Sequence, residues 1–133
     1  MLAQRLPGRD VTPAQLRERS WWKGKALYLL IDDYDLVGGG GSPLGPLSDL
    51  LSQGADIGFH VVLARRASGA GRAIHESVIT QMRNIETPVL LMSGPADEGP
   101  LVGKLRPGPL PAGRGHLVRR DGTQTIQTAW SDI

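Results

Sequence analysis

The sequence contains no cysteine, which excludes disulfide bridges and thiolate metal sites. No apolar run approaches the roughly 20 residues that a membrane-spanning helix needs, and the N-terminus MLAQRLPGRD lacks the apolar stretch of a secretory signal. Aromatic residues make up only 5%, which argues against a base-stacking surface for single-stranded nucleic acid. Neither sign of charge dominates, because 15 basic and 13 acidic residues leave a net charge of +2. This balance does not favour nucleic acid or an anionic membrane as a partner.

The residues that are present predict one α/β domain. The chain has 133 residues, of which 40% are hydrophobic, and this suits a single folded core. Three apolar runs of strand length occur at 26–31, 60–64 and 88–92. Helical patterns occupy the segments 13–18, 44–51 and 72–84. Because strands buried on both faces alternate with helices, we expect an open, mostly parallel sheet with right-handed crossovers.

The end of the chain follows a different pattern. Asp121-Gly122 stands between the two β-prone runs 116–119 and 123–130. Asp-Gly is typical of a two-residue hairpin turn, in which both central residues must tolerate a positive φ. The sequence therefore predicts a β-hairpin at the C-terminus.

The first apolar strand ends in acidic residues, in the stretch ALYLLIDDYD at 26–35. An apolar strand that ends in an acid pair is the second signature of P-loop nucleoside triphosphatases. Asp32 would be the metal-side acid, binding Mg²⁺ through water, and Asp33 would polarise the attacking water. Taken alone, the pattern leaves open the alternative that the strand runs into a solvated turn.

The partner motif that cradles the phosphates does not occur in this sequence. No G-x-x-x-x-G-K-[ST] is present, and Gly103-Lys104 is followed by leucine. Pro107 and Pro109 would break the helix that has to follow such a loop. We therefore expect the chain alone not to hydrolyse ATP.

Three ordered segments resemble a known family: LYLLIDDYDLV, GADIGFHVVLARR and the long run that begins MSGPADEGPLVGKL. They are similar to the last ATPase domain of EccC, the FtsK/SpoIIIE-type motor of type VII secretion. The resemblance runs from about Arg5 to Trp130, so residues 1–133 are expected to be the C-terminal half of one such domain. It implies a RecA-like P-loop fold, ATP with Mg²⁺, and a phosphate-binding loop upstream of Met1.

The resemblance also implies partners and a location. The chain would work with the remainder of its ATPase, within a hexameric motor as in the family, at the cytoplasmic face of the inner membrane. Membrane contact would come only through the rest of the complex. Small helical secreted proteins would be its substrates, recognised by their C-terminal signals.

Within the resemblance, Asp32 and Asp33 match the Walker B acid pair. DNA-pumping relatives carry a Thr-Gln sensor where this chain reads H-V-V-L-A-R-R, so Arg65 or Arg66 is expected to face the phosphates instead. The alternative is that both arginines belong to a solvated loop.

A groove for the export signal is expected on the apolar face of the 44–51 helix. Its candidate residues are Leu44, Leu47, Leu50 and Leu51. The alternative is that these leucines pack on the sheet.

Two other functions remain open at this point. The chain can be a non-catalytic module that binds substrate signal peptides, or, with less support, part of an FtsK-type DNA translocase. The modest net charge and the missing Thr-Gln pair count against DNA.

Overall fold

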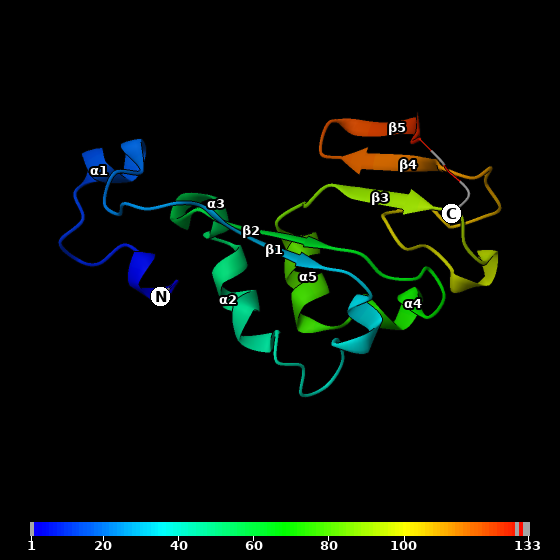
Figure 1. The fold of residues 1–133 in the computed structure, drawn as a ribbon, viewed down its shortest axis with the longest axis horizontal. Helices are drawn as coiled ribbons and strands as arrows, with labels where there is room; N and C mark the ends of the chain where they lie inside the picture. Colours follow the sequence, from blue (N-terminus) through cyan, green and yellow to red (C-terminus); the bar gives the residue numbers. More distant parts are fainter. Residues whose placement is uncertain (1, 130, 132–133) are drawn as a thin grey trace.

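Two small β-sheets and a set of short helices make up the fold (Figure 1). The computed structural model describes residues 2–129 and residue 131. The parallel sheet consists of β1 (Leu27–Ile31) and β2 (Phe59–Leu63). The antiparallel sheet consists of β3 (Val89–Met92), β4 (Arg114–Arg119) and β5 (Gly122–Gln127). This confirms the expected α/β class.

The crossover from β1 to β2 is built from short helical segments. It contains η2 (Tyr34–Leu36), η3 (Gly45–Leu47), α2 (Ser48–Leu51) and α3 (Gly54–Ile57). Their apolar side chains pack with β2 and α5 (Ser77–Asn84) in the main core, whose buried members are Tyr34, Leu51, Ile57, Phe59 and Val78. The predicted 44–51 helix is confirmed as a 3₁₀ turn that continues into α2.

The predicted helix over 72–84 is wrong as one continuous element. The structure has α4 (Ala70–Ala73) and α5, separated by Glu76 in an extended conformation with φ −72° and ψ 144°. The Glu76 carboxylate accepts a hydrogen bond of 2.9 Å from the Gly39 N–H, far away in the sequence. Because a residue in this conformation cannot continue a helix, the chain starts a new one at Ser77.

The expected single, mostly parallel sheet is confirmed only for β1 and β2. The strand β3 pairs with β4 in antiparallel fashion, and among the described residues no strand pairs with the second edge of β2. A groove of about 620 Å³ lies beside β2, lined also by α5 and by residues 85–88. Glu86 has a left-handed backbone (φ 55°) at the point where the chain leaves α5 for β3.

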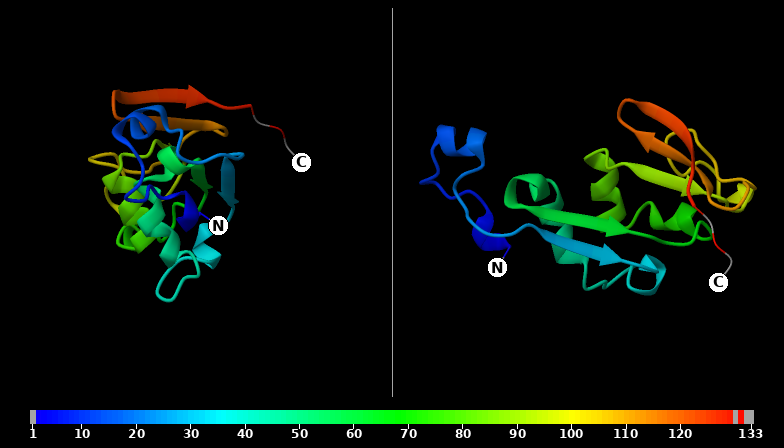
Figure 2. Two further views of the ribbon diagram at one scale, coloured as in Figure 1. Left: turned by 90° about the vertical axis from the view of Figure 1, so that its left-hand side faces the viewer. Right: turned by 45° about the horizontal axis from the view of Figure 1, so that its top comes forward.

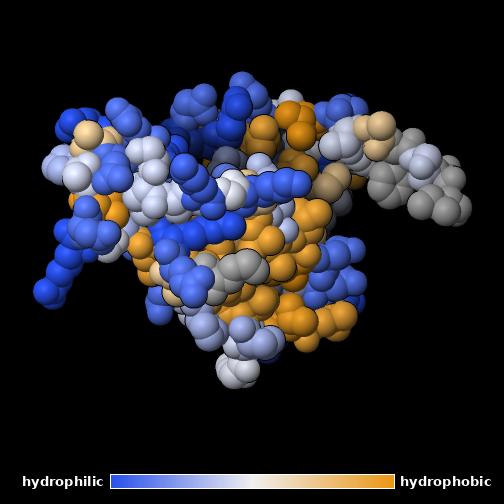
Figure 3. All heavy atoms as spheres, turned by 60° about the vertical axis from the view of Figure 1, so that its left-hand side comes forward, coloured by the Kyte–Doolittle hydropathy of each residue, from blue (hydrophilic) through white to orange (hydrophobic). Residues whose placement is uncertain are grey.

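The parallel pair leaves apolar side chains uncovered. Leu30 is 73% exposed and Val62 is 57% exposed, although both lie within strands. Tyr28 stacks on His60 of the neighbouring strand with 4.7 Å between the ring centroids. Figure 3 shows apolar side chains gathered over a broad part of one face. The helices thus cover one side of β1 and β2, and the other side remains open.

The N-terminal segment and the hairpin lie at opposite ends of the long axis (Figure 2). The segment contains η1 (Ala3–Arg5) and the predicted helix α1 (Pro13–Glu18), which Thr12 caps in a capping box with Gln15. The Arg5 guanidinium lies over the Trp22 ring, 4.5 Å from its centroid. The Trp22 indole N–H donates to the Asp56 carbonyl and so connects the segment to α3. In the described part of the chain, no helix is long and apolar enough to span a membrane.

The predicted C-terminal hairpin is confirmed, with a different turn. Arg119 lies opposite Gly122, so Arg120 and Asp121 form the two-residue loop. Gly122 has a positive φ of 143°, whereas Asp121 does not. Trp130, with which the predicted strand ends, lies outside the described residues. The segment between β3 and β4 contains η4 (Ala96–Glu98).

Candidate functional site

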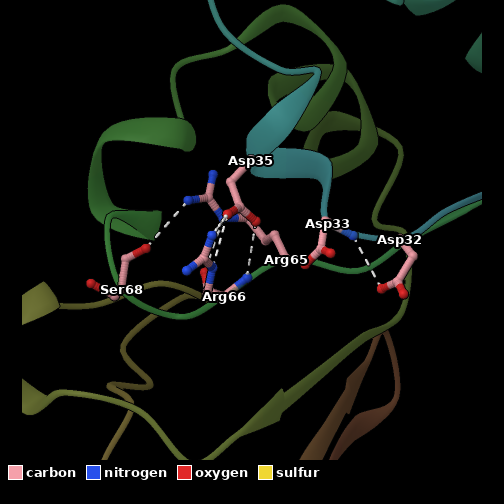
Figure 4. A network of polar contacts seen from close by, with 6 residues as sticks. All are labelled: Asp32, Asp33, Asp35, Arg65, Arg66 and Ser68. Atoms are coloured by element: carbon pink, nitrogen blue, oxygen red, sulfur yellow. Dashed lines mark hydrogen bonds and ion pairs between the residues drawn. The ribbon is translucent and has the colours of Figure 1, made fainter.

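The carboxyl end of β1 presents the acid pair. Asp32 and Asp33 follow Ile31 directly, and both residues are exposed. The Asp33 N–H donates to Asp32 Oδ1 at 3.1 Å (Figure 4). Asp33 has a left-handed backbone with φ 49° and ψ 51°, a conformation that aspartate tolerates better than most residues.

The parallel register brings the end of β2 to the same rim. Ile31 lies opposite Leu63, the Ala64 N–H donates to the Ile31 carbonyl, and the Tyr34 N–H donates to the Ala64 carbonyl, each bond at 2.8 Å. Arg65 and Arg66 come next in the chain. The structure therefore brings the predicted arginines and the predicted acids to one edge, as expected for parallel strands.

Both arginines have partners within the protein. Arg66 Nη2 lies 2.9 Å and Arg66 Nε 3.0 Å from Asp35 Oδ2. Arg65 Nε donates to the Arg66 carbonyl at 3.1 Å, and its Nη2 donates to the Ser68 carbonyl at 3.5 Å (Figure 4). Their phosphate-facing role stays a prediction.

Asp35 is a site residue to which the sequence reasoning assigned no role. Desolvation alone would raise the pKa of Asp35, but the backbone N–H groups of Asp35 and Arg66 and the Arg66 guanidinium hold it below the ordinary value. The available signal was the third acid in IDDYD, which lies two residues beyond the pair and within η2.

The partners of Glu98 could not be predicted, because they are distant in the sequence. Its carboxylate accepts hydrogen bonds from the N–H groups of Gly69 at 2.5 Å and Gly71 at 3.0 Å. These two bonds, in that order, are the main reason that the pKa of Glu98 is lowered. Glu98 thus clamps η4 onto the loop that carries the arginines.

Tyr34 follows the acid pair directly and belongs to the main core. It is 1% exposed, and its hydroxyl has no hydrogen-bond partner among the described residues. Burial, and after it the neighbouring Glu76 carboxylate, raise the pKa of Tyr34 to about 12. The phenol therefore stays neutral and packs as a core side chain.

The acid pair fits a magnesium ion that keeps most of its water. The described residues contain no group of three or more histidine and acidic side chains that could hold a metal. Mg²⁺ is commonly bound by one or two carboxylates together with waters and substrate phosphates, so Asp32 at an exposed rim suits it. The donors for the phosphates themselves are not supplied by a glycine-lysine loop in this sequence.

The proposed signal groove needs correction. Leu51 is 8% exposed and belongs to the main core, so it is not available to a peptide. Leu44, Leu47 and Leu50 are partly buried and pack against the same core. Beside them lies a hollow lined by the glycine loop 39–41 together with Ser42, Gly45 and the α4–α5 junction at 72 and 75–77.

Comparison with known proteins identifies relatives, although no family model matches the chain. The ESX secretion system protein EccC of Thermomonospora curvata is 50% identical over 129 residues, which are 96% of this chain and 10% of that protein. The ESX-4 protein EccC4 of Mycobacterium tuberculosis is 50% identical over 133 residues, which are 98% of this chain and 11% of that protein. The chain thus spans about a tenth of the curated relatives it matches.

Two solved structures that this chain resembles are of EccC as well. The cytoplasmic domain of the T. curvata type VII secretion ATPase EccC superposes with a TM-score of 0.92 at 48% identity, covering 99% of this chain and 16% of that one. ATPases 2 and 3 of the same protein, in complex with a signal sequence peptide, give a TM-score of 0.92 and 24% coverage of that chain. This chain therefore belongs to the EccC family of type VII secretion ATPases and corresponds to one segment of such a protein.

Proposed function

We propose that the chain is the C-terminal half of one FtsK/SpoIIIE-type ATPase domain, the last in its protein, and that Asp32 and Asp33 are its Walker B pair. The observation that carries the proposal is the rim itself, where a parallel pair of strands delivers two exposed acids beside two arginines. In open α/β sheets, ligands bind beyond the carboxyl ends of the strands.

The two acids would divide the work. Asp32 would hold Mg²⁺ through water, and the metal would supply charge neutralisation at the ATP phosphates. Asp33 would accept a hydrogen bond from the attacking water and orient it. Aspartate is shorter than the more usual glutamate by one carbon–carbon bond, roughly 1.5 Å, so hydrolysis is expected to be slow.

The open surfaces support the view that the chain is part of a larger domain. The free edge of β2, the groove beside it and the exposed Leu30 and Val62 are features that a complete domain normally covers. We infer that upstream residues of the parent protein supply the phosphate-binding loop, a strand for this edge and cover for the open face. The assembled domain would have the RecA-like fold.

The partners and location follow from the same proposal. The motor would assemble as a hexamer at the cytoplasmic face of the plasma membrane and drive or gate the export of small helical proteins. The T. curvata relative is itself described as a cytoplasmic domain.

The test is Mg²⁺-dependent ATP binding by the complete polypeptide. Asp32→Asn is expected to weaken Mg²⁺ binding in the presence of ATP about 10- to 100-fold, because a water-bridged carboxylate is lost. Asp33→Asn is expected to leave binding intact and to lower hydrolysis about 100-fold or more. Asp49→Asn, an exposed acid in α2, is the control. An unchanged Mg²⁺ dependence in Asp32→Asn would overturn the assignment.

A second candidate function is capture of export signals, with or without catalysis. It is favoured by the solved T. curvata complex with a signal sequence peptide, which matches this chain over 99% of its length. We place the peptide across the hollow of the glycine loop 39–41, against the partly exposed edges of Leu44, Leu47 and Leu50.

Titration of the complete polypeptide with a substrate's C-terminal peptide tests this placement. Leu44→Ala and His75→Ala are expected to weaken binding, because one borders the hollow and the other lines it. Arg83→Ala, at the far end of α5, is the control. Unchanged peptide affinity in both variants would show that the peptide does not bind in this hollow.

A further inference from the structure

The ion pair between Asp35 and Arg66 joins the two chain segments that form the rim. Asp35 belongs to η2 after β1, and Arg66 belongs to the loop after β2. Asp35 Oδ2 contacts both Nη2 and Nε of Arg66, at 2.9 Å and 3.0 Å. Asp35 Oδ1 accepts a hydrogen bond of 3.4 Å from the Arg66 backbone N–H. The guanidinium is thereby turned toward η2 (Figure 4).

The two partners differ in their freedom to move. The Asp35 side chain is 19% exposed, whereas the Arg66 side chain is 71% exposed. Asp35 sits in a 3₁₀ turn that is closed by the bonds from Leu36 N–H to the Asp33 carbonyl and from Val37 N–H to the Tyr34 carbonyl. The carboxylate is therefore a fixed acceptor, and the guanidinium is the part that can swing away.

The strength of the pair permits an exchange of partners. For an ion pair with one largely exposed member, the equilibrium constant between the paired and the separated state is about five or less. A phosphate group offers more charge and more acceptor oxygens than a carboxylate, and it matches the two-pronged geometry of arginine. An anion at the acid rim can therefore displace Asp35 from Arg66.

We infer that Asp35 is the resting partner of Arg66, and that Arg66 leaves it to bind a nucleotide phosphate when the site is filled. The inference rests on the proposed function of the Asp32–Asp33 rim. Asp35 would act as a positioning residue that keeps the arginine off the acid pair in the empty state. It would also lower nucleotide affinity, since the pair must open before the phosphate is bound.

The test is equilibrium binding of ATP to the complete polypeptide, with thermal unfolding measured in parallel. Asp35→Asn is expected to tighten binding about two- to fivefold, because Arg66 is released in advance. Arg66→Gln is expected to weaken binding about 10-fold. The double variant is expected to bind like Arg66→Gln alone, because Asp35 acts only through Arg66.

A matched control is available elsewhere in the chain. Asp56→Asn releases Arg19 from a pair of similar length, 2.8 Å from Arg19 Nε to Asp56 Oδ1, and should leave ATP affinity unchanged. If Arg66→Gln lowers the unfolding temperature but leaves ATP affinity unchanged, the pair is only structural and the inference fails. Unchanged or weaker binding in a folded Asp35→Asn also overturns it.

The outcome is distinguishable from failure of the proposed function itself. If Asp32→Asn alters the Mg²⁺ dependence of ATP binding and the Asp35 and Arg66 variants change nothing, only the exchange is wrong. If Asp32→Asn also has no effect, the nucleotide site is wrong and the exchange falls with it.

Discussion

Tyr34 links the acid turn to the core, and its hydroxyl gives the first prediction. Its pKa is about 12 in the folded state against 10.0 ordinarily, so between these pH values the folded chain keeps a proton that the unfolded chain has lost. The free energy of unfolding must therefore fall as the pH rises through this window, by about 3 kcal/mol in total. Denaturant unfolding between pH 9 and about pH 12 measures it.

Variants separate this residue from other groups that titrate in alkali. Tyr34→Phe is expected to lose that part of the pH dependence, while its stability at pH 7 changes by less than about 1 kcal/mol, because the deleted hydroxyl has no partner. Tyr28→Phe, at a position that is 64% exposed, should keep the full dependence. Equal slopes in wild type and Tyr34→Phe would refute the burial argument.

At the residue scale, residues that stand out against their sequence neighbours could be predicted, whereas contacts between residues that are distant in the sequence could not. Asp32 and Asp33 stand out because they interrupt an apolar run. The Thr12 cap was predictable from Thr-Pro, and the structure confirms it. Asp35 and Glu98 act through partners 31 and 27 or more residues away, and no spacing rule connects them.

At the scale of elements, the hydrogen bonds from Gly69 and Gly71 to Glu98 in η4 give a second prediction. Glu98→Gln replaces a carboxylate by a neutral acceptor, so it is expected to lower the free energy of unfolding at neutral pH. The pKa of Glu98 is lowered on folding, so its contribution is present above the unfolded value and disappears as the pH falls through the folded value. The variant and wild type should therefore converge in acid. Asp97→Asn, at the exposed neighbouring position, should match wild type throughout.

A third prediction concerns the junction between the N-terminal segment and α3. Gly58 has φ 64°, and a Cβ there would clash with the Trp22 ring. Gly58→Ala is expected to cost about 1–3 kcal/mol and to shift the tryptophan fluorescence. Gly40→Ala, with open space around its Cβ and no positive φ, should be close to neutral. A neutral Gly58→Ala would show that Trp22 is not held against this turn.

Element types were predictable, whereas breaks and sheet partners were not. The apolar runs became β1, β2 and β3, and Asp121-Gly122 marked the hairpin. The interruption at Glu76 depends on a contact with Gly39, and the pairing of β3 with β4 depends on chain geometry after Glu86. Periodicity describes one segment at a time, so it does not report such long-range contacts.

At the scale of the whole molecule, the uncovered face predicts association. With Leu30 and Val62 more than half exposed beside a free strand edge, the isolated 133-residue chain is expected to self-associate. Light scattering should show species larger than the monomer, and Leu30→Lys should reduce them. A monodisperse monomer at high micromolar concentration would contradict the view that this face is normally covered.

The most direct test of the central claim is to locate the metal. With Mn²⁺ in place of Mg²⁺ and ATP bound to the complete ATPase domain, paramagnetic broadening should be strongest at the amides of residues 32–35 and 64–66. The amides of β5, Gly122–Gln127, should be little affected. Broadening centred away from the carboxyl ends of β1 and β2 would contradict the assignment of Asp32 and Asp33.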